Sequence, residues 1–163
     1  WGCGVVDCWY TGLTYAWEHE MSDDLFAALK PGLTAGTEIM VGTRDTAPHV
    51  GSGKVKVLAT PVMVSLMEEA ALNAVEGHLP PGYQTVGTHL DVTHIAATPV
   101  GMRVIATAEL LSIEGRKLKF RVAAKDEIDP IGEGTHERII VELSRFDTRT
   151  AKKAERVASS RKG

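Results

Sequence analysis

The chain has 163 residues, of which 44% are hydrophobic and 24% charged, and this composition suits one globular domain with its own core. A formal net charge of -3 gives it no general affinity for nucleic acid. No apolar run approaches the roughly 20 residues that a membrane-spanning helix needs, and no charged-then-apolar leader resembles a secretory signal. We therefore expect a cytoplasmic protein that binds neither membrane nor nucleic acid.

The first twenty residues differ in composition from the rest, because all three tryptophans and both cysteines lie there. Two interpretations stand. Residues 1–20 originate from cloning or a misassigned start, with the natural chain beginning at Met21, or they form an authentic extension with exposed aromatics. Cys3 and Cys8 have no further ligand cluster around them, so the sequence supports neither a metal site nor a disulfide framework.

The other end is basic, with seven Lys or Arg from Arg145 to Gly163 against only Asp147 and Glu155. Large apolar residues are almost absent after Phe146, so this segment is expected to be a frayed helix or a disordered tail. The sequence thus divides into an atypical extension (1–20), a folded domain (21–146) and a basic flexible tail (147–163).

Within the folded part, 34–45 is typical of a strand, 44–56 of a Gly-rich loop and 60–77 of the one long helix. One helix and about five mostly consecutive strands favour an α+β fold, in which an antiparallel sheet wraps around the helix. The last four strands are predicted near 84–97, 102–113, 116–126 and 134–143.

Strand parity predicts which side chains face the helix. In the first late strand, Val86, Leu90, Val92 and His94 share one face, which makes His94 an inward polar group. Arg138 alternates out of phase with its apolar neighbours, so it is predicted to point away from the helix. In the third late strand the predicted inward residues are Leu118, Phe120, Val122 and Ala124.

A carboxylate interrupts the long helix, which is apolar almost all round and is therefore predicted to be buried. Burying an unpaired carboxylate is costly, so Glu68 needs a partner or a chemical role. Glu69, on another face, is more typical of a rim or ion-pair residue. With Thr60 at the helix start and His94 on the facing strand, the chain has the residues of a hydrolytic site.

Four motifs then identify a family: Ala59 to Glu68 (ATPVMVSLME), VGT at 86–88, VTHIAATP at 92–99 and GTHER at 134–138. Together, over about 34–143, they resemble the fluoroacetyl-CoA thioesterase family of hotdog-fold acyl-CoA thioesterases. The resemblance implies that Thr60, Glu68 and His94 form the catalytic set and that Gly87 lies near the substrate. Arg138 belongs to the last motif, where solvent-face ion pairing and contact with the coenzyme A phosphates are both open.

Simpler roles compete with these assignments, because Thr60 could merely cap the helix and Gly87 could merely relieve crowding. The fluoroacetyl-specific members resemble each other in a Phe-containing lid, whereas Thr46 to Lys56 holds no aromatic residue. The expected activity is therefore hydrolysis of short- or medium-chain acyl-CoA. A hotdog acyl-CoA hydratase or dehydratase and a non-catalytic acyl-CoA-binding protein remain the alternatives.

The reaction implies no cofactor or metal, since coenzyme A is part of the substrate. Eight residues of helix advance about 12 Å, too far for Thr60 and Glu68 of one chain to engage the same thioester carbon closely. We therefore expect a homodimer or higher even oligomer with the site at the subunit boundary.

Overall fold

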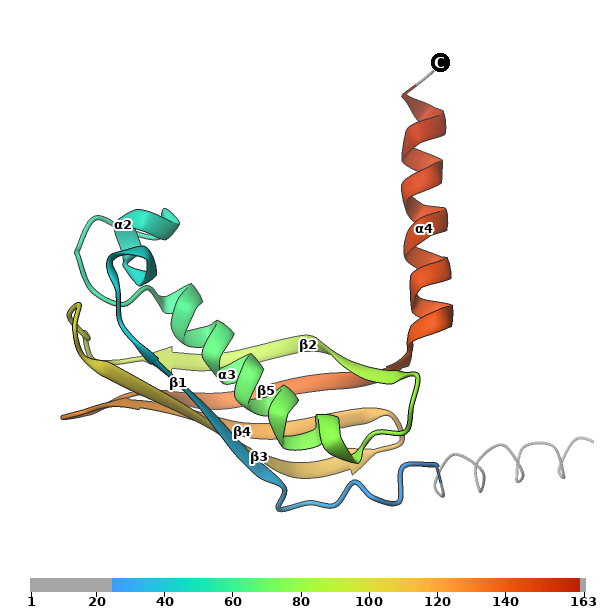
Figure 1. Ribbon diagram of the computed structural model, residues 1–163, viewed down its shortest axis with the longest axis horizontal. Helices are drawn as coiled ribbons and strands as arrows, with labels where there is room; N and C mark the ends of the chain where they lie inside the picture. Colours follow the sequence, from blue (N-terminus) through green and yellow to red (C-terminus); the bar gives the residue numbers. More distant parts are fainter. Residues whose placement is uncertain (1–24, 162–163) are drawn as a thin grey trace, which may run out of the picture.

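Five antiparallel strands form one sheet that curls around a single long helix (Figure 1). The computed structural model describes residues 25–161, so the predictions for residues 1–20 lie outside the described part. The helix, α3 (Thr60–Val75), is followed by a short 3-10 turn, η2 (Glu76–His78). In spatial order the strands are β1 (Thr34–Met40), β3 (Arg103–Glu114), β4 (Lys117–Asp126), β5 (Pro130–Glu142) and β2 (Tyr83–His94). The predicted α+β hotdog architecture is confirmed.

β4 is the central strand of the sheet, and its side chains alternate between the face that covers α3 and the outer face. Its inward side chains are fully or almost fully buried against α3, while its lysines face outward. Burial of a large apolar side chain such as Phe120 contributes roughly 1.5–3 kcal/mol. Gly115 joins β3 to β4 in a left-handed conformation (φ 59°), which favours glycine. The inward residues of β4 are those predicted: Leu118, Phe120, Val122 and Ala124.

The parity prediction for β2 holds for only part of the strand. The β2–β5 register shifts between Gly87 and His89, which marks a β-bulge at Thr88. Because the bulge adds one residue to β2, odd-numbered residues face inward before it and even-numbered residues face inward after it. His94 lies on the inward side, as predicted, but Val86 lies on the opposite face, beside the exposed Ile139.

The prediction that α3 is buried on all sides is wrong for the chain as described. Met63, Met67 and Ala70 are completely buried, but a stripe four residues apart is exposed along the helix. Glu69 lies in this stripe, in keeping with a rim residue. The sheet therefore covers three sides of α3 and leaves one side open. The exposed stripe is Pro61, Ser65, Glu69 and Asn73.

Two segments predicted as irregular contain helix. The segment after β1 forms a 3-10 turn, η1 (Thr43–Asp45), and a one-turn helix, α2 (Ala47–Val50), so it is not a simple loop. The basic tail forms α4 (Leu143–Ser160), which corresponds to the helical alternative of the prediction and begins before the expected boundary at 146. No helix in the described part is long and apolar enough to cross a membrane. A cytoplasmic location stays a prediction.

Candidate active site

Thr60 and His94 are joined at one end of the sheet. The Thr60 hydroxyl and His94 Nδ1 lie 2.9 Å apart, although one belongs to the start of α3 and the other to the end of β2. The residue that caps α3 is Ala59, and no side chain makes a capping hydrogen bond there. Thr60 is therefore not a helix cap, because its hydroxyl engages the histidine.

His94 is partly enclosed, and its second ring nitrogen is free. Burial lowers the pKa of His94 below its ordinary value of 6.5. Nε2 is buried and has no hydrogen-bond partner within the described residues. Such an orphaned nitrogen is costly unless another molecule completes it. His94 also lines a hollow of about 280 Å³, together with Thr60 and with Ser52 and Val57 from the segment after α2.

Glu68 lies farther along α3, directly over Gly87 of β2. A Cβ atom built on Gly87 would come within 2.6 Å of the Glu68 carboxylate and 3.0 Å of the His136 ring. Only glycine leaves room for the carboxylate at this point. The helix pattern had predicted a buried Glu68. Its side chain is 39% exposed, so the carboxylate is half-buried.

Arg138 points toward the helix, which corrects the prediction that it faces away. Its guanidinium is buried and donates to the Thr85 hydroxyl (2.8 Å), the Thr85 carbonyl (3.0 Å) and the Glu68 carbonyl (3.4 Å). The predicted strand began at 134, and its inward face was assigned to Ile139, Val141 and Leu143. In the structure, Ile140 and not Ile139 is buried, so the predicted phase was off by one residue.

His136, which the sequence interpretation did not select, completes this second group. Its Nδ1 lies 2.8 Å from the His89 carbonyl, which can only accept, so Nδ1 carries the hydrogen. Nε2 then accepts from Arg138 at 3.1 Å. Burial, together with the charge of Arg138, lowers the pKa of His136. The 3.9 Å approach of His136 Nε2 to Glu68 is therefore not an ion pair, since the imidazole is neutral.

The candidate residues thus form two groups in one chain. Thr60 and His94 make one, and Glu68 with Gly87, His136 and Arg138 makes the other. Eight residues of helix, about 12 Å, separate Thr60 from Glu68. The GTHER motif at 134–138 was the available signal for His136, because it carried two polar side chains two residues apart on one strand face.

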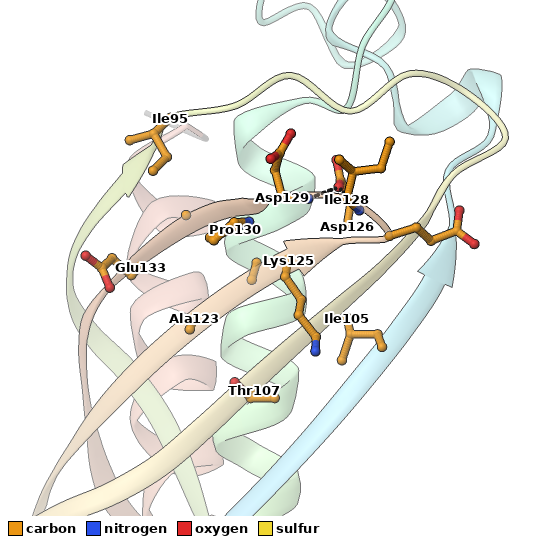
Figure 2. A pocket seen from close by; sticks show the side chains of 13 residues that line it. Ile95, Ile105, Thr107, Ala123, Lys125, Asp126, Ile128, Asp129, Pro130 and Glu133 are labelled. Carbon is orange, nitrogen blue, oxygen red and sulfur yellow. Dashed lines mark hydrogen bonds between the residues drawn. The ribbon is translucent and has the colours of Figure 1, made fainter.

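A second hollow of the described part lies elsewhere, on the sheet face away from α3. It measures about 770 Å³ and surrounds the β4–β5 turn, between Ile95 and Glu133 (Figure 2). Its polar residues are Thr107, Lys125 and four carboxylates around the turn, and neither Thr60 nor Glu68 reaches it. Thr60 and His94 line the smaller hollow, whereas Glu68 lines neither of the two.

A sheet curled around one helix, with a carboxylate, a histidine and a threonine along their contact, defines a hotdog-fold thioester hydrolase. Residues 41–144 match the family model described as fluoroacetyl-CoA-specific thioesterase. The fluoroacetyl-CoA thioesterase of Streptantibioticus cattleyicolor is 49% identical over 98 residues, which cover 60% of this chain and 70% of that enzyme. The chain belongs to this family.

Solved structures agree. A structure of the fluoroacetyl-CoA thioesterase superposes with a TM-score of 0.73 at 40% identity, covering 77% of this chain and 97% of the other. A thioesterase superfamily member from Thermus thermophilus gives a TM-score of 0.75 at 30% identity, with 80% and 96% covered. The family match over residues 41–144 includes α3, the strands β2 to β5 and both groups of candidate residues.

Proposed function

We propose that the protein hydrolyses short- or medium-chain acyl-CoA to the free acid and coenzyme A, with Thr60, Glu68 and His94 as the catalytic residues. The observation that carries this proposal is the hydrogen bond between Thr60 and His94 in a chain of this family. A relative supports the substrate class, because a threonine variant of the fluoroacetyl-CoA thioesterase has been solved with acetyl-CoA.

The two groups meet when two copies pair through β2. This strand is at one edge of the sheet, and both Gly87 and His94 belong to it. If a second copy extends the sheet in antiparallel fashion, a twofold axis between Leu90 and Asp91 puts His94 of one chain opposite Gly87 of the other. Glu68 lies over Gly87, so each dimer would hold two composite sites.

In such a site, Glu68 attacks the thioester carbonyl carbon to form an anhydride, or it removes a proton from an attacking water. The carbon–sulfur bond breaks, and the leaving thiolate takes the proton that neutral His94 has accepted from the attacking water, directly or by way of Glu68. Water supplies the oxygen of the acid product. Thr60 orients the His94 ring through Nδ1 and leaves Nε2 directed to the reacting groups. In the first turn of α3, Pro61 has no N–H and the N–H groups of Val62 and Met63 donate to the Ala59 carbonyl, which leaves the Thr60 N–H and the positive end of the helix dipole for the developing oxyanion.

His136 and Arg138 position Glu68. The neutral His136 accepts from Arg138, and Arg138 in turn holds the α3 carbonyl of Glu68 itself. Removal of either side chain leaves buried polar groups unpaired beside the carboxylate, which costs about 1–3 kcal/mol per group. We assign them a positioning role, with Gly87 providing the space.

The proposal is tested by thiol release from a panel of acyl-CoAs of increasing chain length, with an enzyme blank because the chain itself contains two cysteines. We expect release of one thiol per acid formed, without any cofactor or metal. Hydration of an enoyl-CoA without thiol release would instead indicate a hydratase. Tight acyl-CoA binding with no reaction would indicate a binding protein.

A further inference from the structure

Helix α4 carries a stripe of basic residues along one side. Arg145, Arg149, Lys152 and Arg156 follow at intervals of four, three and four residues, so their side chains lie on the same face. From the first to the last, the stripe is about 16 Å long. None of the residues of α4 is buried, so the whole stripe is accessible.

The charges of the stripe are mostly uncompensated. Arg145 contacts Glu142 at 3.1 Å, but no acidic side chain of the described residues lies within ion-pair distance of Arg149, Lys152 or Arg156. From Leu143 to Arg161 the chain has six Lys or Arg against two acidic residues. Like charges one turn apart destabilise a helix by a few tenths of a kcal/mol for each pair. An anion bound along the stripe would remove that cost.

The stripe begins within reach of the proposed site. The first residue of α4, Leu143, donates its backbone N–H to the Gly82 carbonyl at 2.9 Å, just before β2. Gly82 is five residues from Gly87, about 17 Å along an extended strand. From there α4 extends away from the sheet, starting where β5 ends and β2 begins (Figure 1). An extended pantetheine arm that starts at Gly87 and follows β2 would end near α4.

We propose that the basic stripe of α4 binds the diphosphate and 3′-phosphate of coenzyme A while the thioester lies at Glu68 and Gly87. Arginine suits this ligand, because its planar guanidinium donates two parallel hydrogen bonds to one phosphate. The inference rests on the proposed function, since it takes acyl-CoA as the substrate. It adds a recognition surface for the nucleotide end.

The test compares an acyl-CoA with the same acyl group on N-acetylcysteamine, which lacks every phosphate. For Arg149→Glu/Arg156→Glu, we expect KM for the acyl-CoA to rise at least about tenfold, with less than about a twofold change in kcat. KM for the N-acetylcysteamine thioester should not change. Salt should raise KM for the acyl-CoA in the native enzyme and have little effect in the variant.

The matched control is Lys119→Glu/Lys125→Glu, which reverses two charges on exposed outward positions of β4 and should leave both substrates unaffected. A competing location for the phosphates is Lys54 and Lys56, after α2. If Lys54→Glu/Lys56→Glu raises KM for the acyl-CoA and the α4 variant does not, the inference is overturned. Equal loss with both substrates, or dissociation of the dimer by the α4 variant, also overturns it.

Calorimetric binding of free coenzyme A separates this inference from the proposed function. If the native protein hydrolyses no thioester but its affinity for coenzyme A falls at least about tenfold in the α4 variant, the phosphate site stands and the catalytic proposal fails. If thioesters are hydrolysed while coenzyme A affinity and KM are unchanged in that variant, the catalytic proposal stands and the phosphate site fails.

Discussion

Thr60 Oγ1 and His94 Nδ1 lie 2.9 Å apart, across 34 positions of sequence. The bond joins the first residue of α3 to the last residue of β2, so it fixes the ring beside the start of the helix. It also leaves Nε2 as the free nitrogen, which the chain itself does not satisfy. Glu68 is beyond the reach of this pair within one chain, and the missing partner for Nε2 is best sought in a second subunit or in substrate.

Subunit complementation is the first prediction. Thr60→Ala and Glu68→Ala chains should each be nearly inactive alone, but mixing them under subunit exchange should restore activity. A mixed dimer then contains one site with neither substitution and one site with both, so statistical mixing should restore about a quarter of native activity. The measurement is thiol release from the mixture against each parent.

A fully active monomer, shown by ultracentrifugation at assay concentration, would contradict the shared site. Failure of complementation despite demonstrated exchange between labelled chains would do the same.

Glu68 and His94 should be individually essential. Glu68→Gln and His94→Ala are each expected to lower kcat by at least about two orders of magnitude, because each removes an acid–base or nucleophilic group. Glu69→Gln is the matched control for Glu68, since it changes the neighbouring carboxylate on the exposed side of α3. Circular dichroism should show the same fold in all three variants. Near-normal turnover in either purified variant would exclude that residue from the mechanism.

Gly87 gives a test of the space below the carboxylate. Gly87→Ala places a Cβ 2.6 Å from Glu68 Oε1, so the carboxylate must move, and kcat should fall by about one to two orders of magnitude. Gly77→Ala is the control, because a Cβ there meets nothing within 4 Å. If both variants retain native kcat, the position of Glu68 over Gly87 has no catalytic importance.

The pH dependence of kcat/KM should reflect the burial of His94. A general base must be neutral, and burial penalises its charged form, so more acid is needed to protonate it than for an ordinary histidine. The acid limb is therefore expected to begin below pH 6.5, with full activity from there to about pH 8. An acid limb centred above pH 7 would show that His94 is not a base with a lowered pKa.

Stretches with strong periodicity could be predicted from sequence. The alternation of β4 gave its inward residues correctly, and the apolar run from Thr60 gave α3. Single-residue events could not be predicted. The bulge at Thr88 reversed the face of Val86, and a phase error of one residue in β5 turned Arg138 outward in the prediction. Parity arguments assume an uninterrupted strand, and one inserted residue inverts everything beyond it.

For the candidate site, too, the residues at the ends of regular elements could be predicted, whereas contacts that depend on strand register could not. Thr60 and His94 could be assigned to one site because Thr60 begins the helix and His94 lies on the inward face of a strand, and the structure joins them by a hydrogen bond. His136 was not selected, although the GTHER motif places it two residues before Arg138 on the same strand face. Its bond to the His89 carbonyl depends on the β2–β5 register, which the strand pattern does not predict. The separation of Glu68 from Thr60 did follow from sequence, since helix rise alone fixes it.

Selectivity is the last prediction. The segment after β1 folds into η1 and α2, but from Thr46 to Lys56 it offers no aromatic side chain, and residues 51–56 are exposed. The solved relatives include a phenylalanine-to-alanine variant of the fluoroacetyl-CoA-specific thioesterase. A segment of small and polar residues cannot grip one small acyl group tightly.

An apolar pocket that merely accommodates methylenes separates neighbouring chain lengths by about 1–3 kcal/mol each. We therefore expect graded kcat/KM values over several acyl-CoAs and no large preference for fluoroacetyl-CoA over acetyl-CoA. Replacing Val50 and Val55, both exposed in this segment, by Phe should increase discrimination if an aromatic cover is what selects. The two specificity constants are measured side by side in the native protein and the variant. A native preference of about a thousandfold for the fluorinated substrate would show that selection does not require an aromatic residue in this segment.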